Sequence, residues 1–289
     1  MFTEIHLRTK DNLSLYSCRN EVEDPKAQFL ILHGYTEHCR RYDQIAEAIN
    51  EVGINVIRYD HRGYGRSEGK RAYINSFGQY TDDLKWLIHN HIDPDLPLYI
   101  GSWSMGGLIL ASYIIEEGNQ DLAGCIFCSS ALKINEDLSP FLQKISGILS
   151  KITPWLKLVK LDSSALSRDP HVVEEYLNDP LVYKKGIYAR TGGEMLKQTR
   201  AVQDKFHKIS CPLLILHGTA DQLTDPAGSQ KLYDEASSTD KTIKLYDGWF
   251  HELFKEPEKG EVFELLKNWL KNEERLLNAS GGPYMVNEK

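Results

Sequence analysis

The feature that most constrains this fold is a strand, a tight turn and a helix that follow one another without a break. The expected strand covers 98–102, Ser104 stands in the small-residue turn that follows, and an apolar helical run extends from Leu108 to Ile115. A sharp strand-to-helix turn lifts a serine hydroxyl clear of the sheet and points the first helical N–H groups at the carbonyl it attacks. The pattern predicts a nucleophilic serine and acyl-transfer chemistry.

One position of this turn departs from the usual pattern. Ser102 stands two residues before Ser104, where glycine is usual, although Gly101 lies one place earlier. Serine is small enough for such a turn. The alternative is a plain junction in which Ser104 only caps the helix and the glycines serve close packing. The rest of the chain must decide between the two.

A nucleophilic serine needs a base, and the base needs a carboxylate that orients it and stabilises its charged form. Asp221 comes shortly after the apolar run Pro212–Gly218, and His251 comes shortly after Thr242–Tyr246. Because the carboxyl ends of parallel strands meet at one edge of a sheet, both residues are expected beside Ser104. The chain order Ser, Asp, His agrees. We predict these three residues as nucleophile, acid and base.

Other residues compete for two of these roles. Asp225 and Asp247 are the nearest alternatives for the acid, and His33 and His217 are alternatives for the base. Each of these histidines ends a predicted strand directly before a glycine. We therefore favour a packing or loop-shaping role for both.

The loop after the early strand Phe29–His33 is the predicted mouth of the site. Such a loop commonly donates the second N–H of an oxyanion hole, and the residue after the nucleophile donates the first. We assign these donors to the backbone N–H groups of Tyr35 and Met105.

Apolar strand patterns alternate with helical patterns along most of the chain, which predicts an α/β fold with a mostly parallel central sheet flanked by helices. An antiparallel hairpin is expected before it. The expected strands cover 29–33, 54–59, 98–102, 124–129, 212–217 and 241–246, and the expected helices cover 42–52, 77–91, 105–117 and 262–270.

The alternation is interrupted between residues 132 and 209, which carry no strong buried strand. We interpret this stretch as an inserted helical cap. The core then comprises residues 1–131 and 210–276, and residues 277–289 form a C-terminal tail.

Apolar residues recur at helical spacing within the predicted cap. At least half of them are expected to pack the cap onto the core, and the others to line an acyl tunnel or touch a lipid surface. Each buried CH₂ contributes roughly 0.8 kcal/mol, so such a cap can select long acyl chains. The residues are Leu138, Phe141, Leu142, Ile145, Ile148, Leu149, Ile152, Trp155, Leu156, Leu158 and Val159.

Composition and charge limit the classes of binding partner that the chain is expected to have. The net charge of −7 argues against nucleic acid and against strong attraction to anionic membranes, so any lipid contact is expected to be hydrophobic. The five sparse cysteines and the lack of a secretory pattern favour a cytoplasmic location. The Cys125-Ile-Phe-Cys128 spacing lies in a buried strand pattern without a second pair, which favours core packing over a metal site. No cofactor is expected.

Several motifs resemble those of the monoacylglycerol lipase and lysophospholipase group within the α/β-hydrolase superfamily. The resemblance extends from about residue 5 to about residue 272. It is carried by His33–His38 with Arg41 and Tyr42, Asp60–Gly69, Ser102–Gly107, His217–Asp221 and Tyr246–His251, and by the cap segments Asp162–Pro170 and Asn178–Val182.

The resemblance implies an α/β-hydrolase fold with a helical cap, together with the triad and the oxyanion donors assigned above. It also implies that Glu37 and Arg41 lie near the polar glycerol end of the substrate. Trp103 stands where histidine is common in the group, which changes the pocket shape to be expected.

The combined interpretation is a serine hydrolase that cleaves a single-chain lipid ester, monoacylglycerol foremost, with transient contact between the cap and a membrane or micelle. One alternative is a general carboxylesterase or a lysophospholipase, for which Arg41 with Arg62 or Arg66 would bind the phosphate. Another is an exopeptidase like the proline iminopeptidases, in which Glu37 would bind an α-amino group. A non-catalytic scaffold is the third. The oligomeric state is left open.

Overall fold

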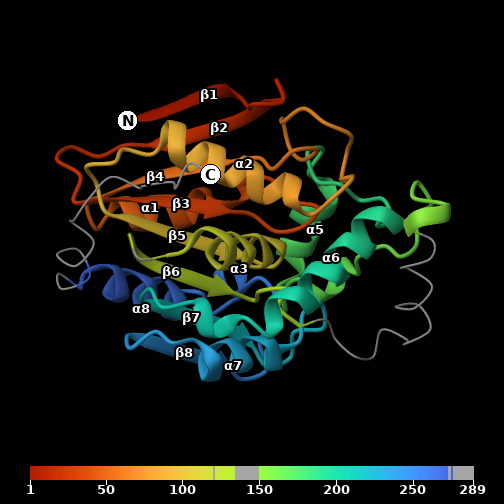
Figure 1. The fold of residues 1–289 in the computed structure, drawn as a ribbon. Coiled ribbons are helices and arrows are strands. Elements are labelled where there is room, and N and C mark those ends of the chain that lie inside the picture. Colours follow the sequence, from red (N-terminus) through yellow and green to blue (C-terminus); the bar gives the residue numbers. More distant parts are fainter. Residues whose placement is uncertain (120, 134–149, 273–274, 276–289) are drawn as a thin grey trace.

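The computed structural model describes residues 1–119, 121–133, 150–272 and 275. Within them the chain forms an eight-stranded sheet in the order β1-β2-β4-β3-β5-β6-β7-β8 (Figure 1). The first pairings, β1 with β2 and β2 with β4, are antiparallel, and the others are parallel. The strands are β1 (Phe2–Arg8), β2 (Ser14–Asn20), β3 (Ala27–Leu32), β4 (Ile54–Tyr59), β5 (Leu98–Trp103), β6 (Leu122–Cys128), β7 (Leu213–Gly218) and β8 (Lys241–Tyr246).

Helices cover both faces of the sheet. The core helices are α1 (Asp43–Asn50), α2 (Gly78–His91), α3 (Met105–Glu117), α7 (Pro226–Glu235) and α8 (Gly260–Leu270). Apolar residues of α2, α3 and α7 belong to one buried cluster, and those of α1 and α8 belong to another on the opposite face. The predicted α/β-hydrolase fold is confirmed.

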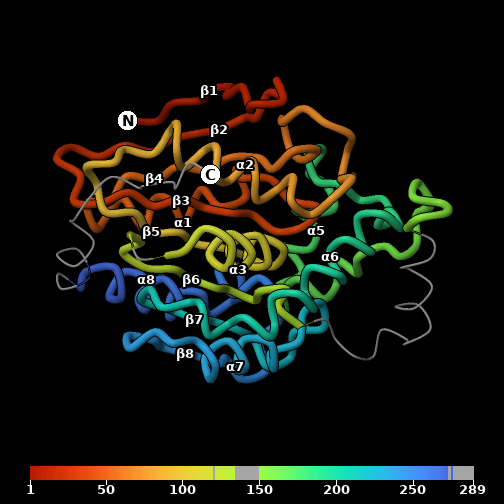
Figure 2. The backbone as a smooth tube through the Cα atoms, viewed as in Figure 1, coloured from red at the N-terminus to blue at the C-terminus, as the bar shows by residue number. Residues whose placement is uncertain are grey.

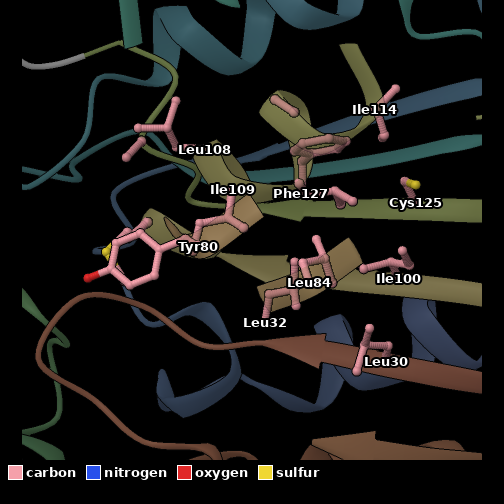
Figure 3. Packing of buried hydrophobic residues seen from close by; sticks show 14 of the residues in the cluster. Leu30, Leu32, Tyr80, Leu84, Ile100, Leu108, Ile109, Ile114, Cys125 and Phe127 are labelled. Atoms are coloured by element: carbon pink, nitrogen blue, oxygen red, sulfur yellow. The ribbon is translucent and has the colours of Figure 1, made fainter. Parts of the chain in front are cut away.

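Strand β3 shows how the sequence serves both faces. Leu30 and Leu32 join the cluster under α2 and α3, whereas Phe29 and Ile31 join the cluster under α1 and α8. This follows from the two-residue period of a strand, and a strand buried on both faces is apolar throughout. Figure 3 shows Leu30, Leu32, Ile100 and Phe127 of the sheet beside Leu84 of α2 and Leu108 and Ile109 of α3.

The predicted helix 42–52 differs from the structure at both ends. A 3₁₀ turn, η1 (Cys39–Tyr42), comes first, and α1 then begins at Asp43 and ends at Asn50. Gly53 has a φ of 79°, a left-handed conformation that lets the chain turn from the helix into β4.

The chain leaves the sheet after β6 and returns at β7, and Figure 2 shows this excursion to one side of the sheet. Its described part contains η2 (Ser163–Ala165), α5 (Pro170–Asn178), α6 (Ala189–Gln203) and η3 (Phe206–Lys208). It adds no strand to the sheet within the described residues. The division at residues 132 and 209 stays a prediction, and the apolar positions Leu138–Leu149 and the tail 277–289 lie outside the described residues. No helix in the described part is long and apolar enough to cross a membrane.

A close approach between α3 and β3 depends on Gly106. A Cβ at this position would overlap the carbonyl oxygen of Leu32, which belongs to the rigid backbone of the sheet. The turn into α3 can therefore lie against the sheet only because this residue has no side chain.

We predict that Gly106→Ala lowers the free energy of unfolding by about 1–3 kcal/mol or more, because the helix must shift away from the sheet. Urea denaturation measures this change. Gly260→Ala is the matched control, since a Cβ there meets no atom within 4 Å. Equal stability of the two variants would contradict the close-approach argument.

Candidate active site

Ser104 lies between β5 and α3 with φ 52° and ψ −115°, a left-handed conformation that non-glycine residues rarely adopt. Its backbone is held by hydrogen bonds from its N–H to Cys128 and from the Ala131 N–H to its carbonyl, at 3.1 and 2.9 Å. Such strain persists only where the surroundings impose it, and it is typical of reactive turns.

The departure at Ser102 has a local explanation. Its hydroxyl donates a 2.7 Å hydrogen bond to the carbonyl of Ile126 in the neighbouring strand β6, and the side chain is fully buried. A serine therefore fits the turn with its polar atom satisfied. The substitution leaves the backbone of the elbow intact.

His251 and Asp221 meet at the carboxyl edge of the sheet. Asp221 follows β7, His251 follows β8, and His251 Nδ1 lies 2.7 Å from Asp221 Oδ2. The other oxygen, Oδ1, accepts hydrogen bonds from the backbone N–H groups of Leu223 and Thr224, at 2.8 and 3.1 Å. These bonds orient the carboxylate toward the imidazole.

The electrostatics of this pair favour charge separation. Burial by itself raises the pKa of Asp221, but the charge of His251 and hydrogen bonds from His217 and His251 outweigh it and hold that pKa well below its ordinary range. Burial likewise lowers the pKa of His251, but the Asp221 carboxylate outweighs it and raises that pKa above its ordinary value. An imidazolium formed during a reaction is therefore stabilised.

The competing residues lie elsewhere or act differently. Asp225 caps α7 through the Ala227 N–H, and Asp247 accepts a hydrogen bond from Thr219. His217 is fully buried, with one nitrogen 3.1 Å from Asp221 Oδ2 and the other 2.7 Å from Ser229. It is a second partner of the Asp221 carboxylate, a role that the sequence pattern did not indicate.

One pocket contains most of the predicted site residues. Ser104 and His251 line it together with Tyr35, Glu37 and Arg41. Its apolar wall combines Leu161 and Leu166 from the excursion after β6 with Ile45, Trp103 and Phe254 from the core. The pocket thus has an apolar side and a charged side at the same serine.

Two backbone N–H groups are available beside Ser104. Among the described residues, neither the Tyr35 nor the Met105 N–H donates a hydrogen bond, and Met105 is the first residue of α3. The Gly34 backbone also lies close to the nucleophile position, since a Cβ there would approach Ser104 Cβ to 3.2 Å. Neither N–H group is engaged elsewhere among the described residues, and their assignment as oxyanion donors stays a prediction.

The charged side is a compact network of four charged side chains and one tyrosine. Arg41 Nη2 lies 3.2 Å from Glu252 Oε2, Arg41 Nε lies 3.6 Å from Glu37 Oε1, and Lys255 lies 2.8 Å from Glu252. The Tyr42 hydroxyl donates to Glu37 at 2.5 Å. Burial opposes ionisation of Glu37, but Arg41 and Lys255 outweigh it and lower its pKa to about 2.

Sequence reasoning missed Glu252 and Lys255 in this network. Their only signal is position, because they closely follow His251 in the chain. It also wrongly offered Arg62 and Arg66 for the pocket. Arg62 pairs with Asp83 and Asp11, and Arg66 pairs with Glu4. Because these carboxylates hold the two arginines elsewhere, neither arginine lines the pocket.

The sheet, its helices and the serine turn define an α/β hydrolase, and comparison with known proteins narrows this class. The profile of the family described as "Serine aminopeptidase, S33" matches residues 23–258, and the chain belongs to that family.

Individual relatives are similar over most of their length. The chain is 32% identical to the monoacylglycerol lipase of Mycolicibacterium smegmatis over 86% of this chain and 89% of that enzyme. It is 33% identical to the monoglyceride lipase of Homo sapiens over 92% and 89%. The crystal structure of the Paleococcus ferrophilus monoacylglycerol lipase superposes with a TM-score of 0.81 at 30% identity, covering 89% of this chain and 98% of that one.

The Asp221–His251 pair predicts a pH-dependent activity. Ester hydrolysis should fall as His251 is protonated, with a midpoint above about 6.5, the ordinary value for histidine. In Asp221→Asn the favourable charge is lost, so the midpoint should move to lower pH while kcat drops by about 10⁴. The pH profile of kcat/KM for a short p-nitrophenyl ester measures both effects.

Asp225→Asn is the matched control, because Asp225 only caps α7 and pairs with Lys133. It should keep the wild-type profile. An acid limb that stays in place in Asp221→Asn would contradict the assigned pairing.

Proposed function

We propose that this chain is a serine hydrolase that cleaves the ester of a single-chain lipid, above all monoacylglycerol, to glycerol and a free fatty acid. The observation that carries the proposal is one pocket in which Ser104 and the Asp221-bound His251 stand between an apolar wall and a charged group. The relatives named monoacylglycerol or monoglyceride lipases support the same substrate.

The proposed reaction proceeds through an acyl-enzyme. His251 Nε2 takes the proton of Ser104 as Oγ attacks the ester carbonyl, and the N–H groups of Tyr35 and Met105 bind the oxyanion. His251 then gives its proton to the leaving glycerol oxygen. Water, activated by the same imidazole, attacks the acyl group and restores Ser104.

The two sides of the pocket bind different parts of the substrate. Leu161 and Leu166 contact the acyl chain, whose CH₂ groups gain about 0.8 kcal/mol each on burial. Glu37 and Arg41 lie on the charged side and offer an acceptor and donors to glycerol hydroxyls. A substrate with one apolar chain and a small polar alcohol matches both sides.

The alternative substrates fit less well. An aminopeptidase needs a carboxylate free to bind an α-ammonium group, but Glu37 and Glu252 are both engaged by Arg41 and Lys255. A lysophospholipase needs spare positive charge for a phosphate, and these same cations are already paired with carboxylates. A general carboxylesterase shares the chemistry and differs only in how permissive the pocket is.

The decisive test is hydrolysis of a matched panel by wild type and Ser104→Ala. Monoacylglycerols should be turned over faster than lysophosphatidylcholine, short p-nitrophenyl esters and prolyl amides, and the variant should lose both activity and covalent labelling by a fluorophosphonate. Ser76→Ala, an exposed serine, should keep both. Faster cleavage of lysophospholipid or amide would refute the substrate, and an unlabelled wild type would favour a non-catalytic scaffold.

We further propose that the excursion after β6, the predicted cap of residues 132–209, touches a lipid surface. Ile152, Trp155, Leu156 and Val159 are exposed by 67%, 65%, 43% and 45% although they are large and apolar. Exposed lysines at 151, 157 and 160 alternate with them, so the segment is locally cationic despite the overall charge of −7. Aromatic, aliphatic and basic residues together favour an interfacial contact.

This contact predicts that Trp155→Ser reduces co-sedimentation with phosphatidylcholine vesicles several-fold, because the largest exposed ring of the segment is lost. Hydrolysis of a soluble short ester should not change. Leu245→Ser is the control, since Leu245 is exposed on β8 away from the segment. Vesicle binding that is equal in the two variants would contradict the proposal.

We also propose a cytoplasmic location. All five cysteines are described, buried and free of disulfides, which suits a reducing compartment.

A further inference from the structure

The loop that carries Tyr35 is held by a segment far along the chain. Residues 176–183, from the last turn of α5 to Tyr183, lie against it, and we call them the clamp. The Tyr183 N–H donates to the Thr36 carbonyl at 2.9 Å, and the Tyr176 hydroxyl lies 2.7 Å from Thr36 Oγ1. The carbonyl and the hydroxyl of Thr36 are thus both bound by the clamp, directly beside the proposed oxyanion donor.

A second contact lies two residues further along the loop. His38 Nε2 is 2.7 Å from Asp179 Oδ2, while Asp179 Oδ1 accepts the N–H of Leu181 at 2.8 Å. The clamp is itself fixed to the core, because Arg71 donates to the Leu181 carbonyl at 2.7 Å. The segment that holds the loop is therefore itself attached to the core.

Thr36 needs such a partner because of its backbone. Its φ is 72°, in the left-handed region that a β-branched residue rarely occupies. A conformation of this kind persists only when surrounding contacts impose it. Thr36 is buried, and its hydroxyl and carbonyl are both held by the clamp.

We propose that the clamp sets the direction of the Tyr35 N–H, so that the oxyanion hole is complete only while residues 176–183 are seated on the loop. Thr36 and Tyr176 are positioning residues in this scheme, and Asp179 supports them through His38. The inference rests on the proposed function, which gives the Tyr35 N–H its role. Movement of the clamp would then change catalysis without touching Ser104 or His251.

The competing explanation is that these contacts only attach the excursion to the core. Thr191 on α6 provides the comparison. Its hydroxyl donates to the Ala72 carbonyl at 3.1 Å and accepts the Ile74 N–H at 3.3 Å, so it also joins the excursion to the core, but its bonding partners are not residues of the loop 35–38. Thr191 and Thr36 are both buried threonines whose hydroxyls make long-range hydrogen bonds.

The experiment compares Thr36→Val, Tyr176→Phe, their double variant, Thr36→Ser and Thr191→Val on a short p-nitrophenyl ester. Active sites are titrated with a fluorophosphonate, and Tm is recorded for each variant. Loss of a whole oxyanion donor costs about 10²–10³ in kcat, so a misdirected donor should cost roughly tenfold. KM should change less than twofold, since only the transition state carries the oxyanion.

The pattern across variants separates positioning from attachment. The double variant should lose no more kcat than either single variant, because both single variants remove the same hydrogen bond, the one between Thr36 and Tyr176. Thr36→Ser keeps the hydroxyl and should keep kcat. Thr191→Val should keep kcat per active site even where its Tm falls. Binding of a trifluoromethyl ketone, whose adduct is an oxyanion, should weaken by the same factor as kcat/KM.

Three results would overturn the inference. These are wild-type kcat in Thr36→Val and Tyr176→Phe, an equal loss in Thr191→Val, or losses that multiply in the double variant. Any of them, with an active wild type, leaves the proposed function standing. A wild type that hydrolyses no ester removes the proposed function and this inference together.

Discussion

The left-handed backbone of Ser104 is the constraint on which the rest of this structure depends. A strained turn costs about 1–3 kcal/mol and survives only between rigid elements. Here β5 enters the turn from the middle of the sheet, and α3 leaves it under a buried apolar cluster. Gly106 lets the helix approach Leu32, and Ser102 ties the turn to β6. The fold thus supplies the stiffness that a strained, reactive serine requires.

Charge compensation is the second condition that the molecule satisfies around this turn. A carboxylate taken out of water is costly unless cations and hydrogen bonds surround it. Asp221 has two histidines and two backbone N–H groups, and Glu37 has Arg41 and Tyr42. The same pairing leaves a polar side next to apolar walls, which gives the pocket its amphiphilic character.

The excursion after β6 both lines the pocket and contacts the residues that surround Ser104. Leu161 and Leu166 supply apolar wall, and the Leu166 carbonyl accepts the N–H of Glu252, next to His251. On the other side of the pocket, Arg41 Cζ lies over the Tyr176 ring, 5.2 Å from the ring centroid, and the Tyr176 hydroxyl is hydrogen-bonded to Thr36. Residues of this insertion therefore contact both sides of the pocket. The position of the insertion on the core is thereby coupled to the geometry around Ser104.

The sequence by itself determined the fold class and the positions of Ser104, Asp221 and His251 at strand ends, because short continuous apolar runs and small-residue turns are local patterns. Parallel strand ends share one edge, so local placement sufficed to expect these residues together. Only the tertiary structure decided which charges meet. It drew Arg62 and Arg66 away to other carboxylates, brought Glu252 to Arg41, and gave Asp221 a second histidine. Thr36 and Tyr176 stand 140 positions apart, and contacts of that kind arise from packing, which no local periodicity encodes.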